Sequence, residues 1–163
     1  MLGVALLYVG AVLLVNAFWL LGKAETKSTG VLNAFAGTLI FTLAMFNQFQ
    51  ATDMVASFAT AQFLLFGFTY LWVGINCFFS LDNRSLGQYC LFVAIVAVPT
   101  AILTYLAGDP RFGTIWLMWG ALWFTFFLFM GLGKQITKFT AYFTLIVAVI
   151  TGVVGYLLLS GYW

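Results

Sequence analysis

The stretch Leu2–Leu21 reads LGVALLYVGAVLLVNAFWLL and carries no charged side chain. A helix of about twenty such residues crosses a hydrocarbon core of roughly 30 Å, and the block lacks the strict polar–apolar alternation of a membrane strand. We therefore predict a membrane-spanning helix here. Blocks of the same kind recur at 29–50, 57–80, 86–107, 112–132 and 139–161. Together they predict an all-α integral membrane protein, with residues 1–163 forming a single domain of six transmembrane helices.

The composition supports this prediction and excludes several classes of function. Hydrophobic residues make up 64% of the chain and charged residues 6%, whereas a soluble domain carries about 25% charged residues. The chain has no histidine, so we expect no histidine-based metal site or proton relay. No nucleophile–base pair or metal-ligand set can be assembled within the spans, so we expect neither an enzyme nor a cofactor. The net charge of +2 gives no reason to expect a nucleic-acid partner.

The short loops between the blocks predict the orientation in the membrane. Loops two and four hold only Arg111, whereas loops one, three and five hold the other basic residues, Lys23, Lys27, Arg84, Lys134 and Lys138. Basic loops stay in the cytoplasm, so we place loops one, three and five there and both termini outside. Each of these loops joins two spans, which predicts three two-helix hairpins about a common axis. The first block lacks a basic n-region and a clean cleavage site, so we expect a helix rather than a signal peptide.

Aromatic residues form a stripe that a simple interfacial belt does not explain. Trp116, Trp119 and Trp123 are spaced by three and four residues, which places them on one helix face. Trp123 lies near the middle of its span, too deep for a belt. Further single-face sets are Phe112 with this stripe, Phe66 with Tyr70, and Leu2, Leu6, Val9 and Leu13. One interpretation of such stripes is simple helix packing. The other is a passage for water or solute, because three indoles on one face need partners for their buried N–H groups.

Three stretches resemble one known family. MLGVALLYVG at 1–10, LFGFTYLWVGIN at 65–76 and IWLMWGALW at 115–123 are similar to motifs of the AmiS/UreI urea and amide channels. The resemblance extends in order over essentially the whole chain. It implies six helices around a pore in each protomer of a homohexamer. It also implies an outer constriction of Leu2, Leu6, Phe112 and Trp116, and an inner one of Val9, Leu13, Phe66, Tyr70, Trp119, Leu122 and Trp123.

Two departures from the acid-gated members of that family concern regulation. Those channels have a longer, histidine-bearing loop after the second span, where this chain has a few residues around Asp53. They also carry a carboxylate in the sixth span, where Val147 stands here. The resemblance therefore implies the ungated, amide-associated branch: a passive channel of the bacterial inner membrane for urea and short amides such as acetamide and formamide.

Two other functions fit the composition less well. An ion-coupled secondary transporter of small amides usually carries an intramembrane acid or a broken helix for the coupling ion, and the spans contain no acid. A non-transporting membrane assembly subunit would explain the glycines within the spans but not the tryptophan stripe.

Overall fold

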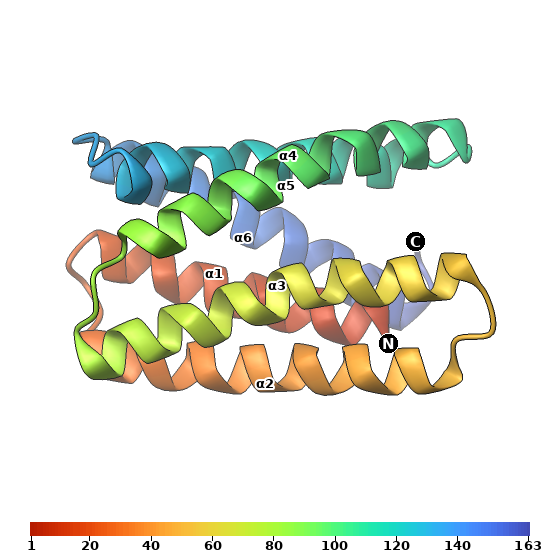
Figure 1. Cartoon of the computed structure of the whole chain (residues 1–163), viewed down its shortest axis with the longest axis horizontal. Coiled ribbons are helices and arrows are strands. Elements are labelled where there is room, and N and C mark those ends of the chain that lie inside the picture. The colour runs from red at the N-terminus through yellow and green to blue at the C-terminus, as the bar shows by residue number, and fades with distance from the viewer.

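The computed structural model describes residues 1–163, which form six long helices joined by short loops (Figure 1). Their bounds are α1 Leu2–Leu20, α2 Thr26–Gln50, α3 Met54–Phe79, α4 Arg84–Leu106, α5 Pro110–Phe126 and α6 Thr137–Ser160. A π-helical turn, η1 Phe127–Gly131, extends α5. Each of the six spans is long and apolar enough to cross a membrane, so the chain is an all-α, multi-pass membrane protein.

The helices after α1 begin two or three residues before the charge-free blocks, and carboxylate side chains cap the first turns of α2, α3 and α5. The Glu25 carboxylate accepts hydrogen bonds from the backbone N–H groups of Lys27 at 2.8 Å and Ser28 at 2.6 Å. These bonds, which favour the ionised form, lower the pKa of Glu25. Asp53 and Asp109 cap α3 and α5 in the same way. Hydropathy therefore underestimates the length of these helices at the loops.

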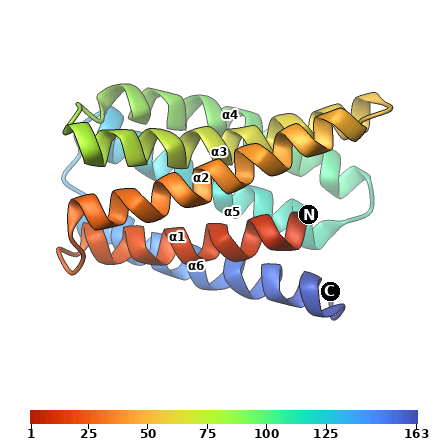
Figure 2. The ribbon, with the colours of Figure 1, turned by 90° about the horizontal axis from the view of Figure 1, so that it is seen from below.

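The closely packed helix pairs differ from the expected hairpins. The most extensive contacts join α1 to α6, α2 to α3 and α4 to α5, whereas the pairs joined by the basic loops touch far less. Figures 1 and 2 both show these three pairs side by side around the middle of the bundle. The two helices of each hairpin predicted from loops one, three and five are therefore consecutive in sequence, but each packs mainly against a helix outside its hairpin.

Glycines explain why these pairs form. A Cβ atom on Gly10 would lie 2.5 Å from the Cα atom of Gly152, so the backbones of α1 and α6 can approach only without one. A Cβ atom on Gly37 would lie 2.7 Å from the Leu71 backbone, which closes α2 on α3 in the same way. In lipid, where helices gain little from burying apolar surface, this close backbone approach is a main source of association.

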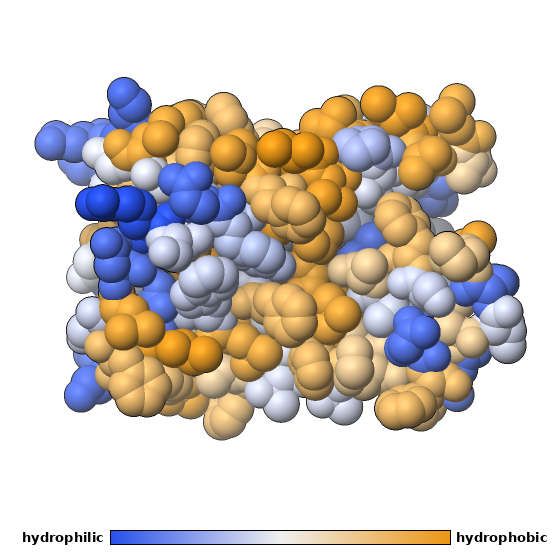
Figure 3. Space-filling model, in the orientation of Figure 1, coloured by the Kyte–Doolittle hydropathy of each residue, from blue (hydrophilic) through white to orange (hydrophobic).

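The two ends of the bundle are unlike. One end holds the three loops with the excess of basic residues, and the other holds both chain termini together with the α2–α3 and α4–α5 loops (Figure 1). Figure 3 shows hydrophobic side chains along most of the visible face, with the strongly hydrophilic ones mainly toward the ends. Throughout the following description, the end with the basic loops is called the inner end and the end with the termini the outer end.

Candidate functional site

A cavity of about 320 Å³ opens at the outer end of the bundle. Residues of α1 and α5 form much of its wall, and those predicted from the sequence to line it are Leu2, Leu6, Phe112 and Trp116. Val9, which was expected at the inner constriction, also lines this outer cavity. The remaining wall comes from α2, α3 and the end of α4, so segments far apart in the sequence enclose one space.

A second cavity, of about 240 Å³, lies toward the inner end. The predicted residues that line it are Leu13, Phe66, Tyr70, Trp119, Leu122 and Trp123. The π-helical turn contributes Phe129 and Met130, and its Gly131 packs against the backbone of Gly87 in α4. Every residue singled out from the stripes therefore faces one cavity or both, although spacing alone favoured simple helix packing.

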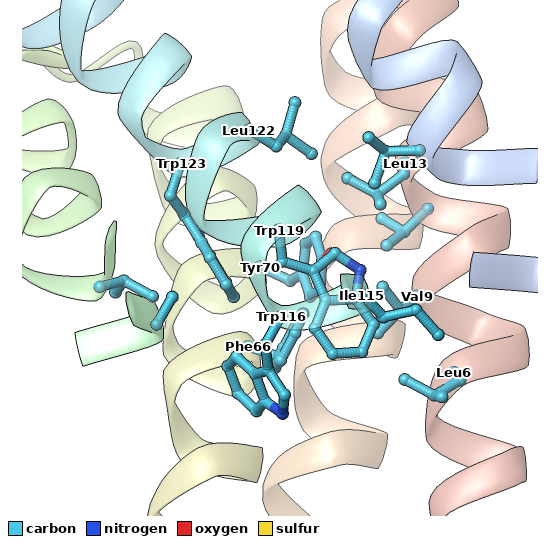
Figure 4. Close-up of a cluster of buried hydrophobic side chains, with 14 of the residues drawn as sticks. Leu6, Val9, Leu13, Phe66, Tyr70, Ile115, Trp116, Trp119, Leu122 and Trp123 are labelled. Atoms are coloured by element: carbon cyan, nitrogen blue, oxygen red, sulfur yellow. The ribbon is translucent and has the colours of Figure 1, made fainter. Parts of the chain in front are cut away.

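Phe66 and Trp119 are the two residues that line both cavities. The Phe66 ring lies 4.9 Å from the Trp119 ring, 4.7 Å from that of Trp123 and 6.0 Å from that of Trp116. Trp116 and Trp119 meet edge to face at 5.2 Å. Figure 4 shows these rings gathered between α3 and α5, with Leu6, Val9 and Leu13 of α1 nearby. We call Phe66, Trp116, Trp119 and Trp123 the ring cluster; it separates the outer cavity from the inner one.

The indole N–H groups of the ring cluster have different surroundings. Trp119 Nε1 donates to Thr151 Oγ1 at 3.0 Å, and both side chains are buried. Trp116 and Trp123 have no such partner in the chain, and their N–H groups are not enclosed by protein. The indole N–H groups of Trp116 and Trp123 are therefore free of any acceptor within the chain, whereas that of Trp119 holds its ring against α6.

Several polar groups at the cavities were not among the residues predicted to form the site. Gln62, Thr104 and Asp109 line the outer cavity, and Asn16 and Asn83 line the inner one. Helical spacing indicated Gln62, which lies one turn before Phe66. Asp109 and Asn83 lie in loops, where periodicity carries no information about which way a side chain faces.

Asp109 brings a charged group from a loop to the outer cavity, although the spans themselves contain no acid. Asp109 is the one lining residue with a formal charge, and its carboxylate accepts a hydrogen bond from the Phe112 N–H at 3.0 Å. It sits at the outer mouth, at the start of α5, and the ring cluster and inner cavity hold no acid or base of this kind. The ring cluster between the two cavities is therefore aromatic and uncharged, and the one carboxylate of the lining lies at the outer mouth.

Known proteins share both the sequence and this architecture. The family profile described as "AmiS/UreI family transporter" matches residues 1–162. A putative transporter protein AmiS2 of Rhodococcus erythropolis is 42% identical, with 97% of this chain and 79% of the relative covered. The acid-activated urea channel of Helicobacter pylori strain J99 is 36% identical over the full length of both chains.

The fold agrees with these relatives. The crystal structure of the urea channel from Helicobacter pylori superposes with a TM-score of 0.90 at 37% sequence identity, covering 100% of this chain and 99% of the other. Its cryo-electron microscopy structure in the closed state gives a TM-score of 0.88. A six-helix membrane bundle with two cavities, matched along its length in sequence and in fold, is a transporter rather than an enzyme, and this chain belongs to the AmiS/UreI family.

Proposed function

We propose that the protein is a passive, ungated channel for urea and short amides in the bacterial cytoplasmic membrane. The observation that carries the proposal is the pair of cavities, one toward each end of the bundle, that meet at Phe66 and Trp119. In this proposal the cavities are vestibules and the ring cluster is the constriction. The residues predicted to line the pore keep that role here.

The chemistry of the ring cluster suits a small, flat, neutral solute. Urea and short amides are planar and fit between ring faces, and their N–H groups can point at aromatic π-electrons. Their carbonyl oxygen can accept from the free indole N–H groups of Trp116 and Trp123. Each contact is weak, which helps, because a conducting site must release what it binds.

Ions meet the opposite situation at the same place. An ion that enters the ring cluster loses water and finds no counter-charge, which costs several kcal/mol. Protons find no chain of titratable side chains to cross it. We therefore propose downhill flux of neutral solutes without coupling to an ion.

We propose the absence of gating because the chain lacks titratable groups that acid-gated members of the family carry. The chain has no histidine, and Val147 of α6 is fully buried where acid-gated members carry a carboxylate. The similarity to the AmiS2 protein of Rhodococcus erythropolis, at 42% identity, supports the amide-associated branch. In keeping with the family resemblance, we also propose a homohexamer with a pore in each protomer, the basic loops in the cytoplasm and the termini outside.

The proposal is tested in proteoliposomes by stopped-flow light scattering with urea or acetamide gradients. We expect flux above that of empty liposomes, unchanged when a protonophore collapses the proton gradient, and no ionic current in planar bilayers. Uptake that stops when the proton gradient is removed would show a coupled transporter instead. Absence of flux for both solutes would favour an assembly subunit.

A further inference from the structure

An asparagine pair lies in the wall at the inner end of the bundle. Asn16 Nδ2 donates to Asn33 Oδ1 at 3.1 Å, and Asn33 Nδ2 donates back to Asn16 Oδ1 at 2.7 Å. Asn33 Nδ2 also donates to the backbone carbonyl of Thr29 at 2.9 Å. Because the nitrogen of Asn33 must face that carbonyl, its oxygen must face Asn16, and this decides the orientation of both amides.

The pair leaves one donor of Asn16 unused. Its oxygen and one of its two N–H bonds are engaged with Asn33, and the second N–H has no partner within the chain. Asn16 is only 6% exposed, and the space it borders is the inner cavity. A buried N–H of this kind is costly unless something in the cavity accepts it.

Asn83, an exposed residue of the α3–α4 loop, also lines the inner cavity. Its Oδ1 accepts from Asn76 Nδ2 at 2.8 Å, while its own Nδ2 has no partner in the chain. Asn83 stands at the start of α4, but its side chain does not cap that helix. The oxygen of Asn76 is enclosed and also lacks a partner, so this pair is open rather than reciprocal. The amide nitrogen of Asn83 is therefore available to a solute in the cavity, at an exposed position that water also reaches.

The outer cavity is lined by polar groups of other kinds. Thr104 donates its hydroxyl proton to the backbone carbonyl of Thr100 at 2.7 Å, which leaves its oxygen as an acceptor. Asp109 presents a carboxylate. Gln62 adds an amide to the outer cavity, and Thr69 of the inner cavity also leaves its hydroxyl oxygen as an acceptor. The inner cavity is therefore distinguished by its two asparagines rather than by a lack of acceptors.

We propose that Asn16 and Asn83 are specificity-determining residues that recognise the carbonyl oxygen of the permeant in the inner cavity. This inference rests on the proposed function and deepens it. Each amide oxygen already accepts one hydrogen bond from a neighbouring asparagine, whereas each amide nitrogen keeps an N–H without a partner in the chain. These N–H groups replace the water that the carbonyl of the solute loses in the ring cluster. Each bond is weak enough to release the solute again.

The test compares acetamide with thioacetamide, because sulfur is the weaker hydrogen-bond acceptor in a molecule of the same shape. Two variants remove the donors. Asn83→Asp keeps the oxygen that Asn76 needs and replaces the donor by an acceptor. The double variant Asn16→Leu/Asn33→Leu replaces both partners of the buried pair by apolar groups, which can be nearly neutral for stability. Ser85→Asp, at an exposed position nearby, adds the same charge as Asn83→Asp outside the cavity.

We expect each donor-removing variant to lower the acetamide-to-thioacetamide permeability ratio by about threefold to tenfold, the worth of one hydrogen bond, and Ser85→Asp to leave it unchanged. A purely structural role would change both permeabilities by the same factor, and an unchanged ratio would overturn the inference. If the double variant does not fold, Asn83→Asp decides alone. Wild-type protein that conducts neither solute would refute the proposed function itself, which is a distinguishable result.

Discussion

Trp119 is held in the ring cluster by a single side-chain hydrogen bond to α6, and this bond can be removed with little change of shape. Thr151→Val replaces the hydroxyl that accepts from Trp119 Nε1 at 3.0 Å by a methyl group. Thr151 is fully buried and Trp119 is 2% exposed, so water cannot easily replace the lost acceptor. Leaving a buried donor without a partner costs about 1–3 kcal/mol, and we expect the free energy of unfolding to fall by that amount.

The matched control is Thr144→Val. Thr144 lies on the same helix and is equally buried, but its hydroxyl donates only to the backbone carbonyl of Thr140, at 2.7 Å. That carbonyl belongs to the helix interior, and such back-bonding contributes little to stability. We expect Thr144→Val to cost less than about 1 kcal/mol. Thermal unfolding in detergent, together with urea permeability in proteoliposomes, measures both variants under the same conditions.

A double-mutant cycle separates this bond from other effects of the threonine. Trp119→Phe removes the indole donor, so Thr151→Val in that background should cost no more than Thr144→Val. Because Trp119 lines both cavities, Thr151→Val should also change urea permeability more than the control does. Equal stability losses for Thr151→Val and Thr144→Val, or no coupling between Thr151 and Trp119 in the cycle, would refute the reasoning.

Three further predictions concern the ring cluster, the helix pairs and pH. Trp123→Ala should alter urea permeability more than Trp72→Ala, because Trp72 lies outside both cavities; equal effects in the flux assay would favour simple packing. Gly10→Ala should destabilise the protein by about 1–3 kcal/mol through overpacking, whereas Gly152→Ala, whose Cβ would lie 3.7 Å from Gly10, should be tolerated; thermal unfolding checks the difference. Flux should vary little between about pH 5 and 8 because the chain has no histidine. The lowered pKa of Glu25 means that its contribution to stability is present above its unfolded pKa and is lost only as pH falls through the folded value. Steep acid activation of urea uptake would contradict the pH prediction.

The membrane helices and the lining stripes could be predicted because both are local properties of the chain. About twenty apolar residues in succession cannot remain in water, and a helical period of 3.6 residues places positions three and four apart on one face. This is why Phe66, Trp116 and Trp119 could be selected before any contact between helices was known. The same residues border the cavities in the structure.

Other features depend on contacts between segments far apart in the chain, and hydropathy gives little information about such contacts. Helix α1 packs against α6 because Gly10 and Gly152 let the two backbones approach closely. This fit depends on the shape of the backbone surfaces, not on how apolar the residues are. The turn of the Asp109 carboxylate into the outer cavity is equally a product of the tertiary structure. The sequence by itself determined that six apolar helices cross the membrane and which faces carry the rings. Only the tertiary structure decided which helices pair and which polar groups reach the cavities, because these depend on how surfaces fit together after the helices have formed.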